Sequence, residues 1–140
     1  MRDYIILTDS CCDLTAETAD QLGLTVLPLS FVMDNKEYYN YLDGRDISAA
    51  DFYAKIRSGL MGTTSAVSVG VFSDAMEQAI QQGKDVLCIP FSGALSTTFQ
   101  SASIAADGLR KQYPEANIKV VDSQAASLGQ GMLLMLAARQ

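Results

Sequence analysis

The stretch that decides the fold is residues 85–98, Asp85-Val86-Leu87-Cys88-Ile89-Pro90-Phe91-Ser92-Gly93-Ala94-Leu95-Ser96-Thr97-Thr98. Its apolar first half, residues 85–91, predicts a buried strand. Its second half is rich in hydroxyl side chains and leads into a long helix, predicted over residues 96–112. A strand that passes through a short loop into a helix is the repeating unit of a parallel α/β sheet.

The same succession occurs on both sides of this stretch. The other predicted strands cover residues 4–8, 25–33, 37–41 and 118–121, and Pro28 interrupts the second of them. The other predicted helices cover residues 14–22, 47–57, 71–82 and a final segment from Ala125 onward. This order predicts an α/β fold, a mostly parallel sheet with helices on both faces.

Polar side chains follow three of the predicted strands. Ligands of such sheets lie at the carboxyl ends of the strands, so we expect Asp9, Ser92 and Asp122 at one rim. Asp9 and Asp122 each precede a serine, and as a pair they are candidates for a metal site. They fit equally well as caps that hold the loops in place. The chain has no Asp-x-Asp spacing, which weakens a magnesium phosphotransferase, and we expect neither a metal nor a cofactor.

Composition narrows the functional classes. The 140-residue chain fits a single domain and is 49% hydrophobic, with a net charge of −6. A negative charge disfavours nucleic acid or an anionic membrane as a partner, and no apolar run is long enough to predict a transmembrane helix. Histidine is absent, which excludes a Ser-His-Asp triad or a Cys-His dyad within this sequence. Three cysteines, two of them adjacent, predict reduced thiols and a cytoplasmic location.

Two hydroxyl-rich runs are the strongest functional signal. The first is Thr63-Thr64-Ser65-Ala66-Val67-Ser68 and the second is Ser92-Gly93-Ala94-Leu95-Ser96-Thr97-Thr98. Each is predicted to lie in a loop that enters a helix, where free N–H groups and the helix dipole favour an anion. Ser and Thr are also the preferred N-cap residues, so either run alone is adequately explained as a cap. Two such runs facing one pocket predict a site for a carboxylate or a phosphate.

The motifs, taken together, resemble a known family. The chain is similar to the N-terminal part of the DegV family, bacterial fatty-acid-binding proteins that present an acyl chain to a fatty acid kinase. The residues that carry the resemblance are Thr8-Asp9-Ser10 with Asp13-Leu14, Val26-Leu27-Pro28-Leu29, Asp46-Ile47-Ser48 with Phe52-Tyr53, Thr64-Ser65 with Ser68, residues 95–102, Val121-Asp122-Ser123, and residues 127–131. The resemblance extends over nearly the whole sequence.

The resemblance implies a function and a set of site residues. It implies a protein that binds a long-chain fatty acid, serves a kinase subunit and has no catalytic activity of its own. The carboxylate-contacting hydroxyls of the family correspond to Thr64 and Ser96, which we expect to lie within several ångströms of each other. Ser65, Thr97 and Thr98 are neighbours that share the expected site. A neutral hydroxyl cradle holds a carboxylate and still releases an acyl phosphate after transfer.

The chain also departs from the family pattern. Ala66-Val67 stands where the family usually has Gln-Pro, and Ser96-Thr97-Thr98-Phe99 where it usually has Ser-Gly-Thr-Tyr. Family members are about twice as long, with a second α/β domain that supplies basic groups. We therefore expect residues 1–140 to form a single α/β domain, the N-terminal part of a longer two-domain protein.

Two other functional classes remain open from the sequence. One is a phosphate-handling transferase or hydrolase on a doubly wound sheet, with Asp9 or Asp122 as nucleophile or metal ligand. The other is a stand-alone interaction module. Magnesium-dependent phosphoester turnover favours the first of these, and co-purified fatty acid favours the lipid carrier.

Overall fold

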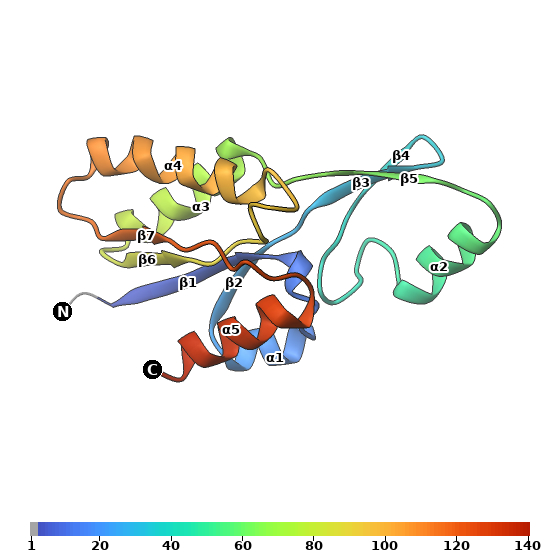
Figure 1. Cartoon of the computed structure of the whole chain (residues 1–140), viewed down its shortest axis with the longest axis horizontal. Coiled ribbons are helices and arrows are strands. Elements are labelled where there is room, and N and C mark those ends of the chain that lie inside the picture. Colours follow the sequence, from blue (N-terminus) through green and yellow to red (C-terminus); the bar gives the residue numbers. More distant parts are fainter. Residues whose placement is uncertain (1–2) are drawn as a thin grey trace.

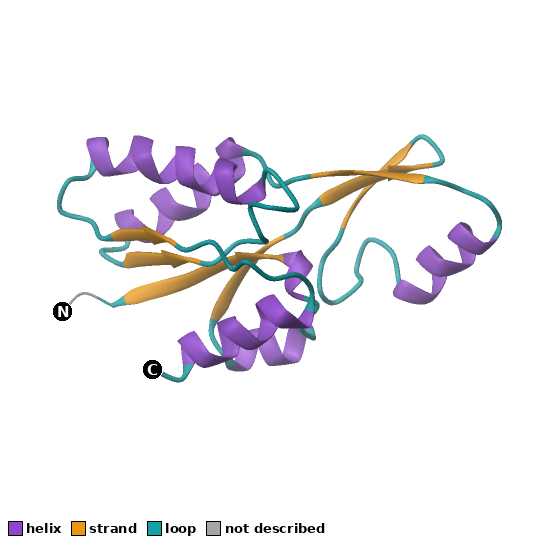
Figure 2. Ribbon diagram, in the orientation of Figure 1, coloured by secondary structure: helices purple, strands orange, loops and turns teal. Residues whose placement is uncertain are grey.

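The computed structural model describes residues 3–140. A four-stranded sheet is flanked by helices, and a three-stranded sheet extends away from it with one helix alongside (Figures 1 and 2). The strands are β1 (Tyr4–Asp9), β2 (Leu24–Leu27), β3 (Ser30–Met33), β4 (Lys36–Tyr39), β5 (Gly62–Ser65), β6 (Asp85–Cys88) and β7 (Ile118–Val120). The helices are α1 (Ala16–Gln21), α2 (Ala49–Arg57), α3 (Val69–Gln81), α4 (Thr98–Gln112) and α5 (Leu128–Ala138), with a short 3-10 helix η1 (Ser10–Cys12).

The four-stranded sheet is parallel throughout, in the order β2-β1-β6-β7. Neighbouring residues on β1 belong to separate cores. Leu7 packs in a cluster with Phe72 of α3 and Ala102 of α4, whereas Ile6 packs in a cluster with Leu134 of α5. α3 and α4 therefore cover one face and α1 and α5 the other (Figure 1). This confirms the predicted fold and explains the continuous apolar run of β1, which is buried on both sides.

Pro28 marks the point where the chain leaves one sheet for the other. The prediction of a single strand over residues 25–33 is wrong: β2 pairs with β1 and ends at Leu27, and β3 starts at Ser30 in the second sheet. Proline has no N–H to donate to a sheet and fixes its own φ, so it suits this junction. What reads as an interrupted strand in the sequence is a switch between sheets.

The three-stranded sheet is antiparallel, in the order β4-β3-β5. Asp34 and Asn35 form the turn between β3 and β4, both with positive φ (54° and 57°). Polar residues of this kind tolerate the left-handed conformation that a tight hairpin requires. The inward side chains Phe31, Met33 and Tyr38 form a small core of their own.

Several helices begin at a hydroxyl side chain that caps their first turn. Thr15 accepts from the N–H of Thr18, and Ser48 accepts from the N–H of Asp51. The last helix is shorter than predicted, because Gln124 and Ser127 have φ of 48° and 53°, outside the helical region, and α5 begins at Leu128. α4 likewise begins at Thr98 rather than Ser96.

The predicted rim is confirmed by two hydrogen bonds that converge on residues 91–93. The N–H of Phe91 donates to Asp9 Oδ2 at 2.7 Å, and the N–H of Gly93 donates to Asp122 Oδ1 at 3.0 Å. Ser92 is buried between them, 2% exposed. The carboxyl ends of β1, β6 and β7 thus meet at one edge of the parallel sheet.

Candidate functional site

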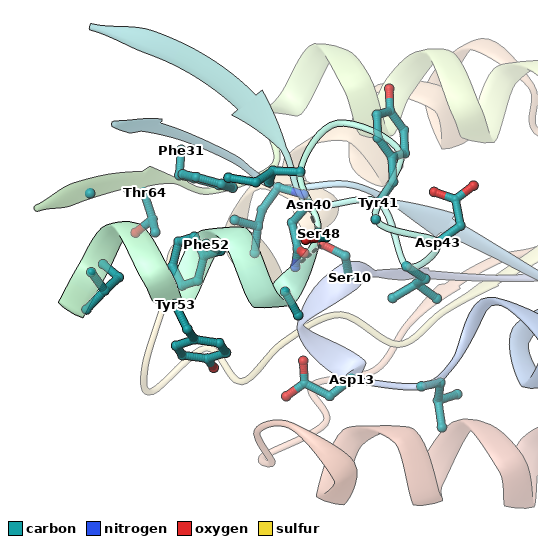
Figure 3. A pocket seen from close by; sticks show the side chains of 18 residues that line it. Ser10, Asp13, Phe31, Asn40, Tyr41, Asp43, Ser48, Phe52, Tyr53 and Thr64 are labelled. Carbon is teal, nitrogen blue, oxygen red and sulfur yellow. Dashed lines mark hydrogen bonds between the residues drawn. The ribbon is translucent and has the colours of Figure 1, made fainter. Parts of the chain in front are cut away.

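A cavity of about 670 Å³ lies where the two sheets meet (Figure 3). One wall is the antiparallel sheet, which contributes Phe31 and Thr64. The loop before α2 and α2 itself form a second wall, and the end of β1 with η1 closes the floor through Ser10. The volume falls in the range typical of sites for small organic molecules.

Helix α2 faces this cavity with its apolar side. No residue of α2 is buried, and Tyr53 and Ile56 line the cavity while 57% and 40% exposed. Only Phe52 is anchored firmly, edge-on against Phe31 with ring centroids 5.2 Å apart. An amphipathic helix normally buries its apolar stripe against a core. Here the stripe lies against a space that an apolar ligand would fill.

The floor of the cavity is polar and already hydrogen-bonded. Ser10 Oγ, in a residue 1% exposed, accepts from the backbone N–H of Leu29 at 3.1 Å and from Asn40 Nδ2 at 3.3 Å. The N–H of Asn40 donates to the carbonyl of Leu29 at 2.8 Å. These bonds join the end of β1 to the start of the antiparallel sheet.

The charged side chains of the cavity are carboxylates. Asp13 and Asp43 line it, and no lysine or arginine does so among residues 3–140. Asp43 is paired with Arg45 at 2.7 Å, and hydrogen bonds from Arg45 hold the pKa of that carboxyl below its usual range. Asp13 makes no hydrogen bond or ion pair with its side chain among the described residues, and Figure 3 shows it apart from Thr64. The side of the cavity near Asp13 repels an anion.

The first hydroxyl run is not in a loop as predicted. Thr63, Thr64 and Ser65 belong to strand β5, where Thr64 pairs with Phe31 of β3. Threonine favours extended backbone, and three successive residues pair with β3, which outweighs the loop signal of the run. All three are exposed, and their hydroxyls make no hydrogen bond to residues 3–140, so they are available to a ligand. Only Ser68 caps a helix, accepting from the N–H of Val71.

The second hydroxyl run is largely engaged in starting α4. Ser96 Oγ accepts from the N–H of Thr98 at 3.2 Å and lies 2.9 Å from Thr98 Oγ1. Thr98 is buried, 4% exposed, and Thr97 is exposed with no side-chain cap bond. One proton of the Ser96–Thr98 hydroxyl pair is left to donate, because a single hydrogen bond uses only one of the two.

Of the five predicted site residues, Thr64 alone lines the cavity; Ser65, Ser96, Thr97 and Thr98 do not. The chain beyond Thr64 turns toward α4, since Val67 is buried in the same cluster as Ala102. The expected approach of Thr64 to Ser96 stays a prediction.

Asp9 and Asp122 act as structural acceptors. Both oxygens of Asp9 are used, Oδ1 by the N–H of Cys11 at 3.0 Å and Oδ2 by Phe91, in a side chain 1% exposed. Asp122 Oδ1 accepts from the N–H groups of both Gly93 and Gln124. This engagement favours the capping interpretation over a nucleophile, which needs access to a substrate.

The cysteines are free thiols held in their protonated form. Burial, with the nearby negative charge of Asp9, raises the pKa of Cys11 to about 12 and also raises the pKa of Cys12 and Cys88. Such thiols are poor nucleophiles at neutral pH. Within residues 3–140 no three Cys, Asp or Glu side chains gather as metal ligands, and no helix there could cross a bilayer.

Sequence reasoning did not find most of the cavity. Ser10, Asn40 and the apolar side of α2 come together only because Pro28 sends β3 into a second sheet. The sequence does carry a cluster of tyrosines at Tyr38, Tyr39 and Tyr41, but side-chain alternation in a hairpin explains such a cluster as well as a pocket does. Tyr41 does line the cavity.

Known proteins resemble this chain over nearly its whole length. Residues 4–140 match the family model described as "Uncharacterised protein, DegV family". A DegV domain-containing protein of Clostridium perfringens is 40% identical over 139 residues, which cover 99% of this chain and 47% of that protein. The chain thus spans about half the length of the curated relatives it matches.

Solved structures share the architecture. A protein from Eubacterium ventriosum described as a fat acid (stearic acid)-binding protein aligns with a TM-score of 0.87 and 32% identity, covering 97% of this chain and 46% of that one. A DegV family protein from Thermus thermophilus, described by its fatty acid binding, aligns with a TM-score of 0.84 and 34% identity, covering 99% of this chain and 47% of that one.

Proposed function

Because the chain belongs to the DegV family, we propose that its cavity binds a long-chain fatty acid. The observation that carries this proposal is the apolar side of α2, which is not buried against a core and faces a cavity of about 670 Å³. The described activities of the relatives from Eubacterium ventriosum and Thermus thermophilus point to the same class of ligand.

The acyl chain supplies most of the binding energy. Each methylene removed from water contributes about 0.8 kcal/mol, so a long acyl chain gains on the order of 10 kcal/mol before the entropy cost of binding. The aromatic rings of Phe31 and Phe52 provide the wall against which it packs.

The carboxylate is bound by hydroxyl groups. Thr64 and Ser65 offer unpaired hydroxyls on β5, and Ser96, Thr97 and Thr98 offer further donors at the start of α4. Each hydrogen bond to a carboxylate contributes about 1.5–3 kcal/mol, so these groups orient the ligand more than they retain it. Repulsion from Asp13 keeps the carboxylate away from the opposite side of the cavity.

The protein acts as a carrier and not as an enzyme. It presents the carboxylate to a fatty acid kinase, which forms the acyl phosphate. The exposure of Thr64 and Ser65 supports this role, because a carboxylate bound there stays accessible to a second protein. The free thiols support a cytoplasmic location.

The carrier is a two-domain protein in this proposal. Residues 1–140 form its N-terminal α/β domain, and the half of the relatives that this chain does not span corresponds to the second. The absence of lysine and arginine from the cavity lining, among residues 3–140, supports a contribution of basic groups from elsewhere.

Titration of delipidated protein with a fluorescent long-chain fatty acid tests the proposal. Ile56→Asp places a carboxylate on the cavity side of α2 at a position already 40% exposed, and we expect it to abolish binding. Ala54→Asp is the matched control, because Ala54 is on the same helix and does not line the cavity. Equal affinity in the two folded variants contradicts the proposal. Magnesium-dependent phosphoester hydrolysis that Asp9→Asn abolishes in folded protein would favour the transferase or hydrolase instead.

A further inference from the structure

The floor of the cavity contains an amide side chain whose hydrogen bonds are only partly satisfied. Asn40 lines the main cavity and a smaller one of about 190 Å³ on the other side of residues 40–43. Its Nδ2 donates to Ser10 Oγ at 3.3 Å (dashed in Figure 3). Its Oδ1 and its second N–H proton have no partner among residues 3–140. An amide facing an otherwise apolar chain loses its hydrogen bonds to water, which disfavours a plain alkyl ligand at this point.

The amide is held in a fixed position. The N–H of Asn40 donates to the carbonyl of Leu29, and the N–H of Leu29 donates to the same Ser10 Oγ that accepts from the Asn40 side chain. Ser10 is 1% exposed and immobilised at the end of β1. The two groups therefore present a preorganised polar spot in the floor, at little entropy cost to a ligand that pairs with it.

From this arrangement we propose that the cavity selects fatty acids that carry a hydroxyl group along the acyl chain, and that the side-chain amide of Asn40 forms hydrogen bonds with this hydroxyl. This inference rests on the proposed function. A hydroxyl donates to Oδ1 and accepts from the N–H of the amide. It pairs equally well if the amide is turned over, since it is both donor and acceptor. A second carboxylate in this cavity is disfavoured by Asp13, which lines it without an ion-pair partner among residues 3–140.

The expected effect is a ratio of affinities. The carboxylate and the methylene groups contribute equally to both ligands, so the difference in affinity reports the hydrogen bonds of the added hydroxyl, which we assign to Asn40. A hydrogen bond made to a group otherwise left unpaired corresponds to about a tenfold difference in Kd. Because the hydroxyl must lie opposite the amide, this preference should be confined to one region of the acyl chain.

The experiment is a titration of the delipidated protein with stearate and a positional series of monohydroxystearates. We expect one position, with its immediate neighbours, to bind about tenfold more tightly than stearate in the wild type. Asn40→Leu should remove that preference while stearate affinity is kept or rises. Ser48→Ala is the control, because Ser48 also lines the cavity but its hydroxyl is engaged in capping α2, and it should leave the ratio unchanged.

The outcomes separate this inference from the proposed function. If stearate binds to the wild type and every hydroxystearate has a Kd within about twofold of that of stearate, the proposed selection is wrong, whatever the variants show. A preference that survives in folded Asn40→Leu assigns it to another residue and overturns the role of Asn40. If neither stearate nor any hydroxystearate binds, the proposed function fails first.

Discussion

The backbone N–H of Phe91 donates to Asp9 Oδ2 across 2.7 Å, although 82 residues separate the two in the chain. The bond ties the end of β1 to the segment that follows β6, its neighbour in the parallel sheet. The same segment carries the loop that starts α4. The position of the predicted hydroxyl site at α4 thus depends on a carboxylate that does not itself contact a ligand.

Asp9→Asn should destabilise the fold by about 2–3 kcal/mol. The asparagine amide would point a donor at the N–H of either Phe91 or Cys11, and one of these would lose its acceptor in a site 1% exposed. Urea denaturation measures the loss. Asp122→Asn is the control, since Asp122 accepts its backbone bonds through Oδ1 alone and the amide oxygen can keep them. Equal destabilisation by both variants would refute this difference in roles.

Thr64→Val should lower the affinity for a long-chain fatty acid about tenfold without lowering the free energy of unfolding. Valine keeps the shape and the preference for extended backbone, and the lost hydroxyl has no partner within the described residues. Ser96→Ala should lower the affinity as well, and it should also cost about 1 kcal/mol of stability, because Ser96 Oγ accepts from the N–H of Thr98. Fluorescence titration and thermal melts of both variants separate the effects, and unchanged affinity in Thr64→Val would remove Thr64 from the site.

The backbone amides of helix α2 should become more protected from hydrogen exchange when a ligand fills the cavity. It buries none of its residues, so its backbone amides are expected to exchange quickly with solvent in the absence of ligand. Burial of Tyr53 and Ile56 by an acyl chain stabilises the helix. Hydrogen exchange followed by mass spectrometry should show that fatty acid slows exchange at residues 49–57. Exchange at the core strand β1 should be the same with and without fatty acid. Identical exchange with and without a bound ligand would place the acyl chain elsewhere.

The thiol of Cys11 should resist alkylation until the solution is strongly alkaline. With a pKa of about 12, only about one molecule in ten thousand carries the thiolate at pH 8. The folded thiol keeps its proton where the unfolded one, with its ordinary pKa of 9.0, loses it. The contribution of this thiol to the free energy of unfolding is therefore fully present below about pH 9 and is lost as the pH rises toward the folded pKa. Iodoacetamide labelling of native and urea-unfolded protein between pH 7 and pH 11 checks this, and equal rates would contradict it.

The parallel half of the molecule was predictable because its signals are local. The apolar run of the buried strand β6 and the helix cap at Thr15 each depend on a few neighbouring residues. The antiparallel sheet was only partly predictable. A proline within one interrupted strand and a proline between strands of two sheets give the same sequence pattern, and Pro28 is the second case. Thr64 was misplaced in a loop for a related reason, as its pairing with Phe31 joins residues far apart in the chain.

The residues of the site divide in the same way, into those with a local signal in the sequence and those brought together only by the fold. Hydroxyl-rich runs are visible in any sequence, and Thr64 does line the cavity. Ser10 and Asn40 carry no local signal of a shared role, since 30 residues separate the atoms that meet at 3.3 Å. Whether a hydroxyl is free or engaged also depends on tertiary contacts, which explains why Ser96 and Thr64 look alike in the sequence and differ in the structure.

The switch at Pro28 makes the cavity a seam between two separately packed units. Its walls come from the end of the parallel sheet and from the antiparallel sheet with α2, and the two sheets share no strand and have separate hydrophobic cores. The hydrogen bond from the N–H of Leu29 to Ser10 Oγ crosses this seam directly beyond the proline. The cavity therefore exists only where the two units meet, and a substitution that displaces either unit changes its shape.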